Sequence, residues 1–202
     1  MYWEFATLVM ILIFFGWCYI EIKIRTKKDD EIENAFWERE QAANSVRRKP
    51  IDHLDYIKIP KDLPRDLLPD NPEIHEIIAT IDRISGSKIL NLTGYSNTDL
   101  KFEYGAANLT ELSACDMNYT TLVTTLQKWA DILRDNDYEE EAVRIMEYLV
   151  STNADIGRTY RLLGKYYLAK GDKDSFAALK ETARGLRSLN GPHIVESLEA
   201  ME

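Results

Sequence analysis

Hydrophobic and polar positions follow different patterns in four successive parts of the chain, and the first part is the most apolar. Residues Phe5–Ile20 are sixteen consecutive residues without a charge. At a helical rise of about 1.5 Å per residue this run is about 24 Å long, and Ile22 and Ile24 extend it toward the thickness of a bilayer core. We therefore predict a transmembrane anchor over residues 1–25 that contacts the membrane through residues 5–22.

A buried core helix and a cleaved signal peptide are the alternatives for this apolar run. A signal peptide needs a basic segment before the run and a small-residue cleavage site after it, and neither occurs around Phe5–Ile20. Basic residues instead follow the run, at Lys23, Arg25, Lys27 and Lys28. The positive-inside rule then predicts a single-pass protein of the cell membrane, with its N-terminus outside and its C-terminal domain in the cytoplasm.

The second part, residues 26–49, has the charge pattern of a helix. Acidic residues lead and basic residues trail, which matches the helix dipole, and Pro50 ends the pattern. Ile32 and Phe36 fall near one face of this helix. We predict a solvated stalk helix, and the alternative is an interfacial or partner-binding helix that uses Phe36 and Trp37.

The third part, residues 50–72, contains five of the six prolines of the chain. Proline favours extended backbone, but this segment is too rich in Ile, Leu and Tyr for a solvated linker. We predict an extended strap that packs on a helical domain; a proline-recognition motif around Pro60 and Pro64 is the alternative. An amphipathic helix is expected over residues 71–85, with Asn71 as N-cap, Pro72 in the first turn and Gly86 at its end.

The fourth part, residues 73–202, contains an internal repeat with an offset of 34 residues. The segment from Leu126 matches the segment from Tyr160. The matched pairs are Leu126 with Tyr160, Trp129 with Leu163, Ala130 with Gly164, Leu133 with Tyr167, Ala142 with Phe176 and Leu149 with Ala183. Small residues allow helices to approach closely, and large residues fill the space between helix pairs. Copies of this kind stack because each pair leaves an apolar face unburied.

In length and pattern this repeat resembles the tetratricopeptide repeat, a 34-residue helix–turn–helix. The second copy carries Leu163-Gly164, Tyr167, Gly171-Asp172 and Ala183 where that family has its pattern, whereas Phe176 and Ser188 depart from it. The resemblance implies two stacked helical hairpins, at about residues 119–152 and 153–187. A capping helix is expected after Gly191 and Pro192. Two hairpins of a bundle without repeats are the alternative.

The resemblance also implies a binding face, because the first helix of each tetratricopeptide pair lines a concave groove. The positions that carry over are Arg158, Arg161 and Lys165 in the second copy and Thr124, Gln127 and Asp131 in the first. The three basic residues share one helix face and form a stripe suited to a carboxylate or an acidic segment of a partner. The alternative is an ordinary solvated face.

Residues 88–118 are harder to assign because they contain many Asn, Thr and Gly residues. We expect short helices and ordered turns that lead into a long helix from Asn118. The phrase SNTDLKFEYGAANL, residues 96–109, is similar to one in uncharacterised anchored proteins of Gram-positive bacteria. That resemblance implies no activity.

The net charge of the chain argues against one class of function, nucleic-acid binding. The chain of 202 residues has a net charge of −9, from 34 acidic and 25 basic residues, and residues 1–49 contribute none of it because eight acids there balance eight bases. An acidic domain is a poor partner for a nucleic-acid backbone, so we expect no nucleic-acid binding.

The chain also lacks the motifs of common enzymes. No phosphate-binding glycine loop occurs, and the zinc-protease pattern that starts at His75 has Ala79 in place of its second histidine. We therefore expect no catalytic residues, no metal site and no cofactor. The pattern favours a membrane-anchored adaptor or scaffold with an unidentified protein partner. The alternatives are a structural or assembly subunit of a membrane complex, acting through its anchor and stalk, and an enzyme.

Overall fold

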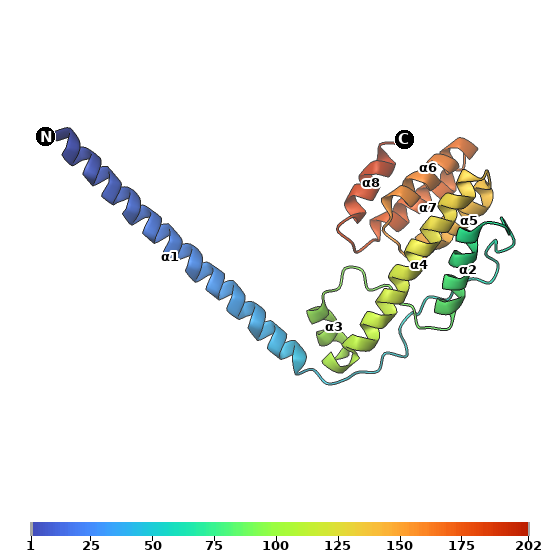
Figure 1. Cartoon of the computed structure of the whole chain (residues 1–202), viewed down its shortest axis with the longest axis horizontal. Coiled ribbons are helices and arrows are strands. Elements are labelled where there is room, and N and C mark those ends of the chain that lie inside the picture. Colours follow the sequence, from blue (N-terminus) through green and yellow to red (C-terminus); the bar gives the residue numbers. More distant parts are fainter. Residues whose placement is uncertain (1, 202) are drawn as a thin grey trace. The chain divides into compact units, whose positions relative to one another are not determined.

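A computed structural model describes residues 2–201, without the side chains of residues 2, 4–8 and 11–13. The described chain is mostly α-helical and contains no strand. Its helices are α1 (Tyr2–Asn44), α2 (Pro72–Ser85), α3 (Asn97–Tyr104), the short 3-10 helix η1 (Ala106–Asn108), α4 (Leu109–Asp135), α5 (Glu139–Ser151), α6 (Gly157–Lys170), α7 (Lys173–Arg184) and α8 (Gly191–Glu199) (Figure 1). They form two units: a smaller one, up to Lys49 together with Asn97–Ala107, and a larger one of Pro50–Ser96 with the residues from Asn108 onward.

In the smaller unit, the predicted anchor and stalk belong to one uninterrupted helix, α1. Within the part of the chain that the structure describes, no helix combines the length and the apolar character needed to cross a membrane. Part of the predicted anchor, the side chains of residues 5–8 and 11–13, lies outside that part. The helix ends at Asn44, five residues before the predicted end of the stalk.

The last turns of α1 are held by α3. Arg39 forms an ion pair with Asp99 (Nη2–Oδ1 2.7 Å), and Glu40 pairs with Lys101 (Oε2–Nζ 2.7 Å). The hydrogen bond from Lys101, with a second from the Thr98 hydroxyl, lowers the pKa of Glu40. The backbone N–H of Lys49 donates to the carbonyl of Tyr104 (3.0 Å). These contacts hold the end of α1 and Lys49, which follows the helix, against α3 and its last residue.

In the larger unit, α2 confirms the helix predicted before Gly86. The Asn71 side chain accepts a hydrogen bond from the N–H of Glu73 (2.9 Å), and Pro72 occupies the first turn. The buried face consists of isoleucines at helical spacing, namely Ile74, Ile77, Ile81 and Ile84. Local capping and amphipathic spacing agree here, which is why the sequence alone was sufficient.

The proline-rich strap packs on the core, as its apolar residues predict. Leu63 is buried, and several partly buried neighbours contact the same core, namely Ile57, Ile59, Leu67 and Leu68. Hydrogen bonds attach the strap to α5: Arg144 donates to the carbonyl of Asp62 (3.1 Å), and the Tyr148 hydroxyl donates to the carbonyl of Lys58 (3.2 Å). The strap is therefore part of the folded unit rather than a free linker.

Helix α4 begins at Leu109, nine residues before the predicted start at Asn118, so that prediction was wrong. Its first turns bury Leu112, Cys115 and Tyr119 at a spacing of three and four residues. The apolar stripe continues without interruption along the helix, through Leu122, Leu126, Trp129, Ala130 and Leu133. Tertiary burial of this stripe outweighs the turn-forming tendency of Asn and Ser in the first turns.

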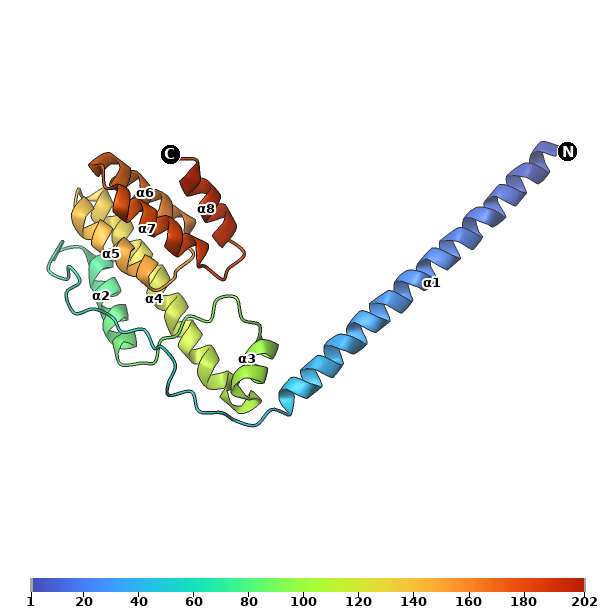
Figure 2. The same cartoon turned by 180° about the vertical axis from the view of Figure 1, so that it is seen from behind.

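Helices α4 and α5 form one hairpin, α6 and α7 a second, and α8 packs against both helices of the second hairpin (Figures 1 and 2). The small residues of the repeat, Ala130, Ala142 and Ala183, are buried. Gly164 is closely packed, because an added Cβ would lie 3.0 Å from Leu198 Cδ2 and 3.2 Å from Phe176 Cε2. The missing side chain at Gly164 therefore allows a close helix contact, as predicted for that position.

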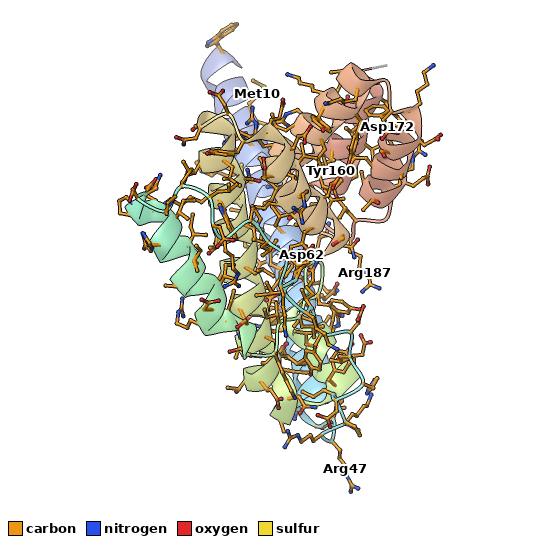
Figure 3. All side chains as sticks on the ribbon, turned by 90° about the vertical axis from the view of Figure 1, so that its right-hand side faces the viewer. Met10, Arg47, Asp62, Tyr160, Asp172 and Arg187 are labelled. Carbon is orange, nitrogen blue, oxygen red and sulfur yellow. The ribbon has the colours of Figure 1, made fainter. Side chains whose placement is uncertain are left out.

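The core is almost entirely apolar, with a few buried polar groups. Tyr160 lies within the helical array (Figure 3), and its hydroxyl and the Trp129 Nε1 have no hydrogen-bond partner among the described atoms. The Tyr119 hydroxyl donates to the carbonyl of Thr152 (3.2 Å). Burial raises the pKa of Tyr119, Tyr148 and Tyr160 to about 12, because the phenolate is excluded from water.

Gly164→Val should destabilise the protein by about 2 kcal/mol or more, because the added methyl groups overpack the contact between α6 and α8. Chemical unfolding of the full chain in detergent measures the loss. Gly86→Ala is the matched control, since a Cβ at Gly86 meets nothing within 4 Å and φ is −86°. Equal losses for the two variants would contradict a close approach at Gly164.

The free energy of unfolding should fall as pH rises from about 10 to 12. Below pH 10, Tyr119, Tyr148 and Tyr160 are protonated in both the folded and the unfolded chain. Above pH 10 the unfolded chain loses these protons first, so unfolding becomes more favourable. Tyr160→Phe should make this decline shallower and cost little stability at pH 7, because it removes a hydroxyl without a partner. Urea unfolding across this pH range is the measurement, and an unchanged slope in Tyr160→Phe would contradict the burial argument.

Candidate functional site

The structure brings four residues of α4 and α6 into one polar network. Arg158 forms an ion pair with Asp131 (Nη1–Oδ2 2.8 Å), and Gln127 donates to the other oxygen of Asp131 (Nε2–Oδ1 3.3 Å). The buried Thr159 hydroxyl donates to Gln127 Oε1. Three of the predicted partner-binding residues, Arg158, Gln127 and Asp131, therefore connect the first helices of the two hairpins.

The other three predicted residues lie outside this network. Arg161 and Lys165 are exposed and have no ion-pair partner among the described residues. The Thr124 hydroxyl donates to the carbonyl of Thr120 (2.9 Å), and its side chain lines a small hollow of about 220 Å³ between α2 and α4. Of the predicted basic stripe, Arg161 and Lys165 thus remain available to a partner, whereas Arg158 already has a counterion.

Lys165 also belongs to a groove that sequence reasoning missed. The groove has a volume of about 360 Å³ and lies between α5, α6 and the C-terminal end of α4; its lining residues are Arg134, Glu139, Val143, Met146, Leu162, Lys165, Tyr166, Ala169 and Lys170. We call it the α5–α6 groove. Its apolar side chains come from both helices, and its lining includes three basic side chains and one carboxylate. The groove therefore combines an apolar surface with a net positive charge.

Two of these basic residues stand near the ends of their helices. Arg134 lies in the last turn of α4, and Lys170 is the last residue of α6. Lys170 lies over the ring of Tyr166, with its Nζ 5.4 Å from the ring centre, and 3.9 Å from a Glu140 oxygen. A basic residue at a helix C-terminus is favoured by the helix dipole, so this pattern gave no reason to predict a site.

The described residues contain no constellation with obvious chemistry. No three His, Cys, Asp or Glu side chains among them are arranged to hold a metal ion. His75, which begins the failed zinc-protease pattern, lies 2.7 Å from the carbonyl of Pro69 through Nε2. Cys115 is buried, and burial raises the pKa of its thiol, which makes it a poor nucleophile.

No protein-family model matches this chain, and comparisons with curated proteins and with solved structures find no match either. A functional assignment therefore has to rest on the residues and their geometry.

The Arg158–Asp131 pair should stabilise the fold by about 0.5–1 kcal/mol, as expected for a partly exposed ion pair. A double-mutant cycle with Arg158→Gln and Asp131→Asn, followed by urea unfolding at low and high salt, measures this coupling energy. The coupling should shrink as salt rises. A coupling energy near zero at low salt would contradict the structural role of the pair and return Arg158 to the surface available for binding.

Proposed function

We propose that this protein is a membrane-anchored adaptor whose helical array, of the tetratricopeptide type, binds an acidic segment of a partner protein. The observation that carries the proposal is the α5–α6 groove together with the adjacent Arg161. Lys165 lines the groove and shares a helix face with Arg161, so Arg161 and the groove form one continuous surface. The proposal includes no catalytic role, no metal and no cofactor.

Charge complementarity supports an acidic partner segment. Residues 50–202 contain 26 acidic and 17 basic residues, from the totals of 34 and 25 less eight of each in residues 1–49. Against that acidic background the groove has three basic side chains and one carboxylate, with Glu140 paired to Lys170 (3.9 Å), and Arg161 lies one helical turn before Lys165. Positive charge at the groove attracts an acidic segment and repels basic ligands, while the acidic background of the domain disfavours an extended nucleic-acid backbone.

The apolar part of the groove supports a segment with both acidic and hydrophobic residues. Val143, Met146 and Leu162 provide apolar contacts, and Met side chains adapt to different partners. A partner with hydrophobic residues next to Asp or Glu matches this surface. The repeat and its stacked hairpins are typical of proteins that present such surfaces, although fold alone does not establish function.

Membrane attachment is supported by the N-terminal sequence. The apolar run Phe5–Ile20 is followed by four basic residues within the next eight positions and is preceded by none. This asymmetry supports an anchor with its N-terminus outside and the helical domain in the cytoplasm. Anionic headgroups repel an acidic domain, which favours a position of the binding surface away from the bilayer.

A second candidate function is that of a structural or assembly subunit of a membrane complex. It is favoured by Phe36 and Trp37 on α1, whose rings pack edge to face with centroids 5.5 Å apart. Both side chains are more than half exposed, at 53% and 58%, and exposed aromatic residues are common in protein interfaces. In that case the stalk, rather than the groove, makes the essential contact.

The charge reversal Arg161→Glu with Lys165→Glu should reduce capture of a crosslinked partner from membranes by at least about tenfold and leave the melting temperature unchanged. The loss follows from repulsion between the new carboxylates and the acidic segment. Quantitative pull-down with the full chain measures capture, and the melting temperature verifies folding. Capture should also weaken as salt rises.

The matched control is Lys61→Glu with Arg83→Glu, which makes the same change of charge at exposed positions away from the groove. Unchanged capture by the Arg161/Lys165 variant, or an equal loss in the control, would contradict the adaptor proposal. If Phe36→Ser with Trp37→Ser abolishes capture and the groove variant does not, the subunit function is supported instead.

A further inference from the structure

The larger unit contains a further concave site, which is separate from the α5–α6 groove. This polar hollow has a volume of about 360 Å³ and is formed by four segments that are far apart in the sequence; its lining residues are Asp55, Ile57, Leu90, Asn91, Thr93, Ser151, Thr152, Asn153, Asp155, Gly185, Leu186, Arg187 and Ser188. Its volume is within the range of small-molecule sites. Most lining residues are polar, so the hollow is suited to a polar ligand.

The walls of the polar hollow are held by hydrogen bonds. The Asn91 amide donates to the carbonyl of Thr152 (3.0 Å) and to the Tyr119 hydroxyl (2.9 Å), and its oxygen accepts from the N–H of Thr93 (2.9 Å). Asn190 donates to the backbone carbonyl of Asp155 (2.8 Å). These bonds connect the segment around Asn91, the α5–α6 loop and the start of α8, so the shape exists before any ligand binds.

Arg187 is positioned by its neighbours in the same unit. Its Nη1 donates to the Tyr95 hydroxyl (2.5 Å), and its guanidinium carbon lies 5.3 Å from the centre of the Tyr95 ring. Gly94 has φ +89°, and an added Cβ would lie 3.0 Å from the Arg187 backbone oxygen. Figure 3 labels Arg187 at the edge of the helical array. The stacked guanidinium retains other N–H groups for a ligand.

Several polar groups of the hollow are unused. The Ser188 hydroxyl is buried and has no hydrogen-bond partner in the described structure. The carboxylates of Asp55 and Asp155 form no hydrogen bond or ion pair with the described residues. A buried hydroxyl without a partner is costly, and a bound ligand would remove that cost. The groups available to a ligand are thus the carboxylates of Asp55 and Asp155, the Ser188 hydroxyl and the remaining N–H groups of Arg187.

We propose that the polar hollow binds a small zwitterion that carries an ammonium and a carboxylate group, of which free amino acids are the simplest examples. The ammonium group pairs with Asp55 and Asp155, and the carboxylate pairs with Arg187, while Ser188 provides a hydrogen bond. A dicarboxylate would face the two aspartates, and a diamine would face the guanidinium, so neither satisfies both sides. The site uses different residues from the partner-binding groove and does not depend on the proposed adaptor function.

The test is titration calorimetry of the full chain in detergent with each free L-amino acid at millimolar concentration. Putrescine and succinate serve as the purely cationic and purely anionic probes. At least one amino acid should bind, and neither putrescine nor succinate should bind as tightly. Failure of every amino acid to bind, or tighter binding of putrescine or succinate than of any amino acid, would overturn the proposal.

Variants then locate the binding. Asp155→Asn and Arg187→Gln should each lower the affinity for the bound amino acid by at least about tenfold, since each removes a charge-assisted contact. Asp66→Asn and Arg83→Gln are matched controls, because both side chains are exposed and lie outside the hollow. Binding that is unaffected by Asp155→Asn and Arg187→Gln, or weakened equally by the controls, would place the ligand elsewhere and overturn the assignment.

Ser188→Ala separates a ligand contact from a purely structural role. If the hydroxyl contacts the ligand, the variant binds the amino acid several-fold more weakly and keeps the melting temperature of the ligand-free protein or raises it. Unchanged binding with a raised melting temperature would remove Ser188 from the site. A lowered melting temperature without change in binding would also contradict its proposed role.

Discussion

Burial of the apolar stripe of α4 is the interaction on which the larger unit depends. The stripe extends over the length of the helix, from Leu112 to Leu133, and each of its residues is nearly inaccessible to water. Helix α2 and the strap contribute to the same core, and α5 forms the other half of the hairpin. Because the buried face is so long, no single neighbouring helix can cover it, and several elements must pack on α4 together.

Close packing at small residues extends this core to the second hairpin. A Cβ at Gly164 would be crowded by side chains of α7 and α8, and Ala130, its match in the first copy, is buried, as are Ala142 and Ala183. Large residues such as Trp129 and Tyr160 fill the remaining space. The cost of this arrangement is visible in Trp129 Nε1 and the Tyr160 hydroxyl, which are buried without a hydrogen-bond partner within the described structure. The apolar packing of these two large rings outweighs the loss of two hydrogen bonds.

The two candidate binding sites lie at the surface, where helix ends and loops meet. The α5–α6 groove uses basic residues near the ends of α4 and α6, and the polar hollow uses loops together with the strap. Asn91 shows how such a site is formed, because one side chain links three segments by hydrogen bonds. Rigid helices determine where the loops meet, and the loops provide the polar groups.

The sequence by itself determined the helical class, the helix after Asn71 and the small-residue positions of the repeat, because capping, periodicity and side-chain size act locally. It placed the start of α4 too late, since Asn and Ser near Leu112 favour turns in isolation and only burial against the core makes them helical. It also grouped Arg158 with Arg161 and Lys165, which share a helix face. Only the tertiary structure separated them, because Asp131, 27 residues away, forms an ion pair with Arg158, whereas the other two have no ion-pair partner among the described residues. The polar hollow likewise has Asp55 and Arg187 among its lining residues, and no local pattern encodes that these distant segments line one site.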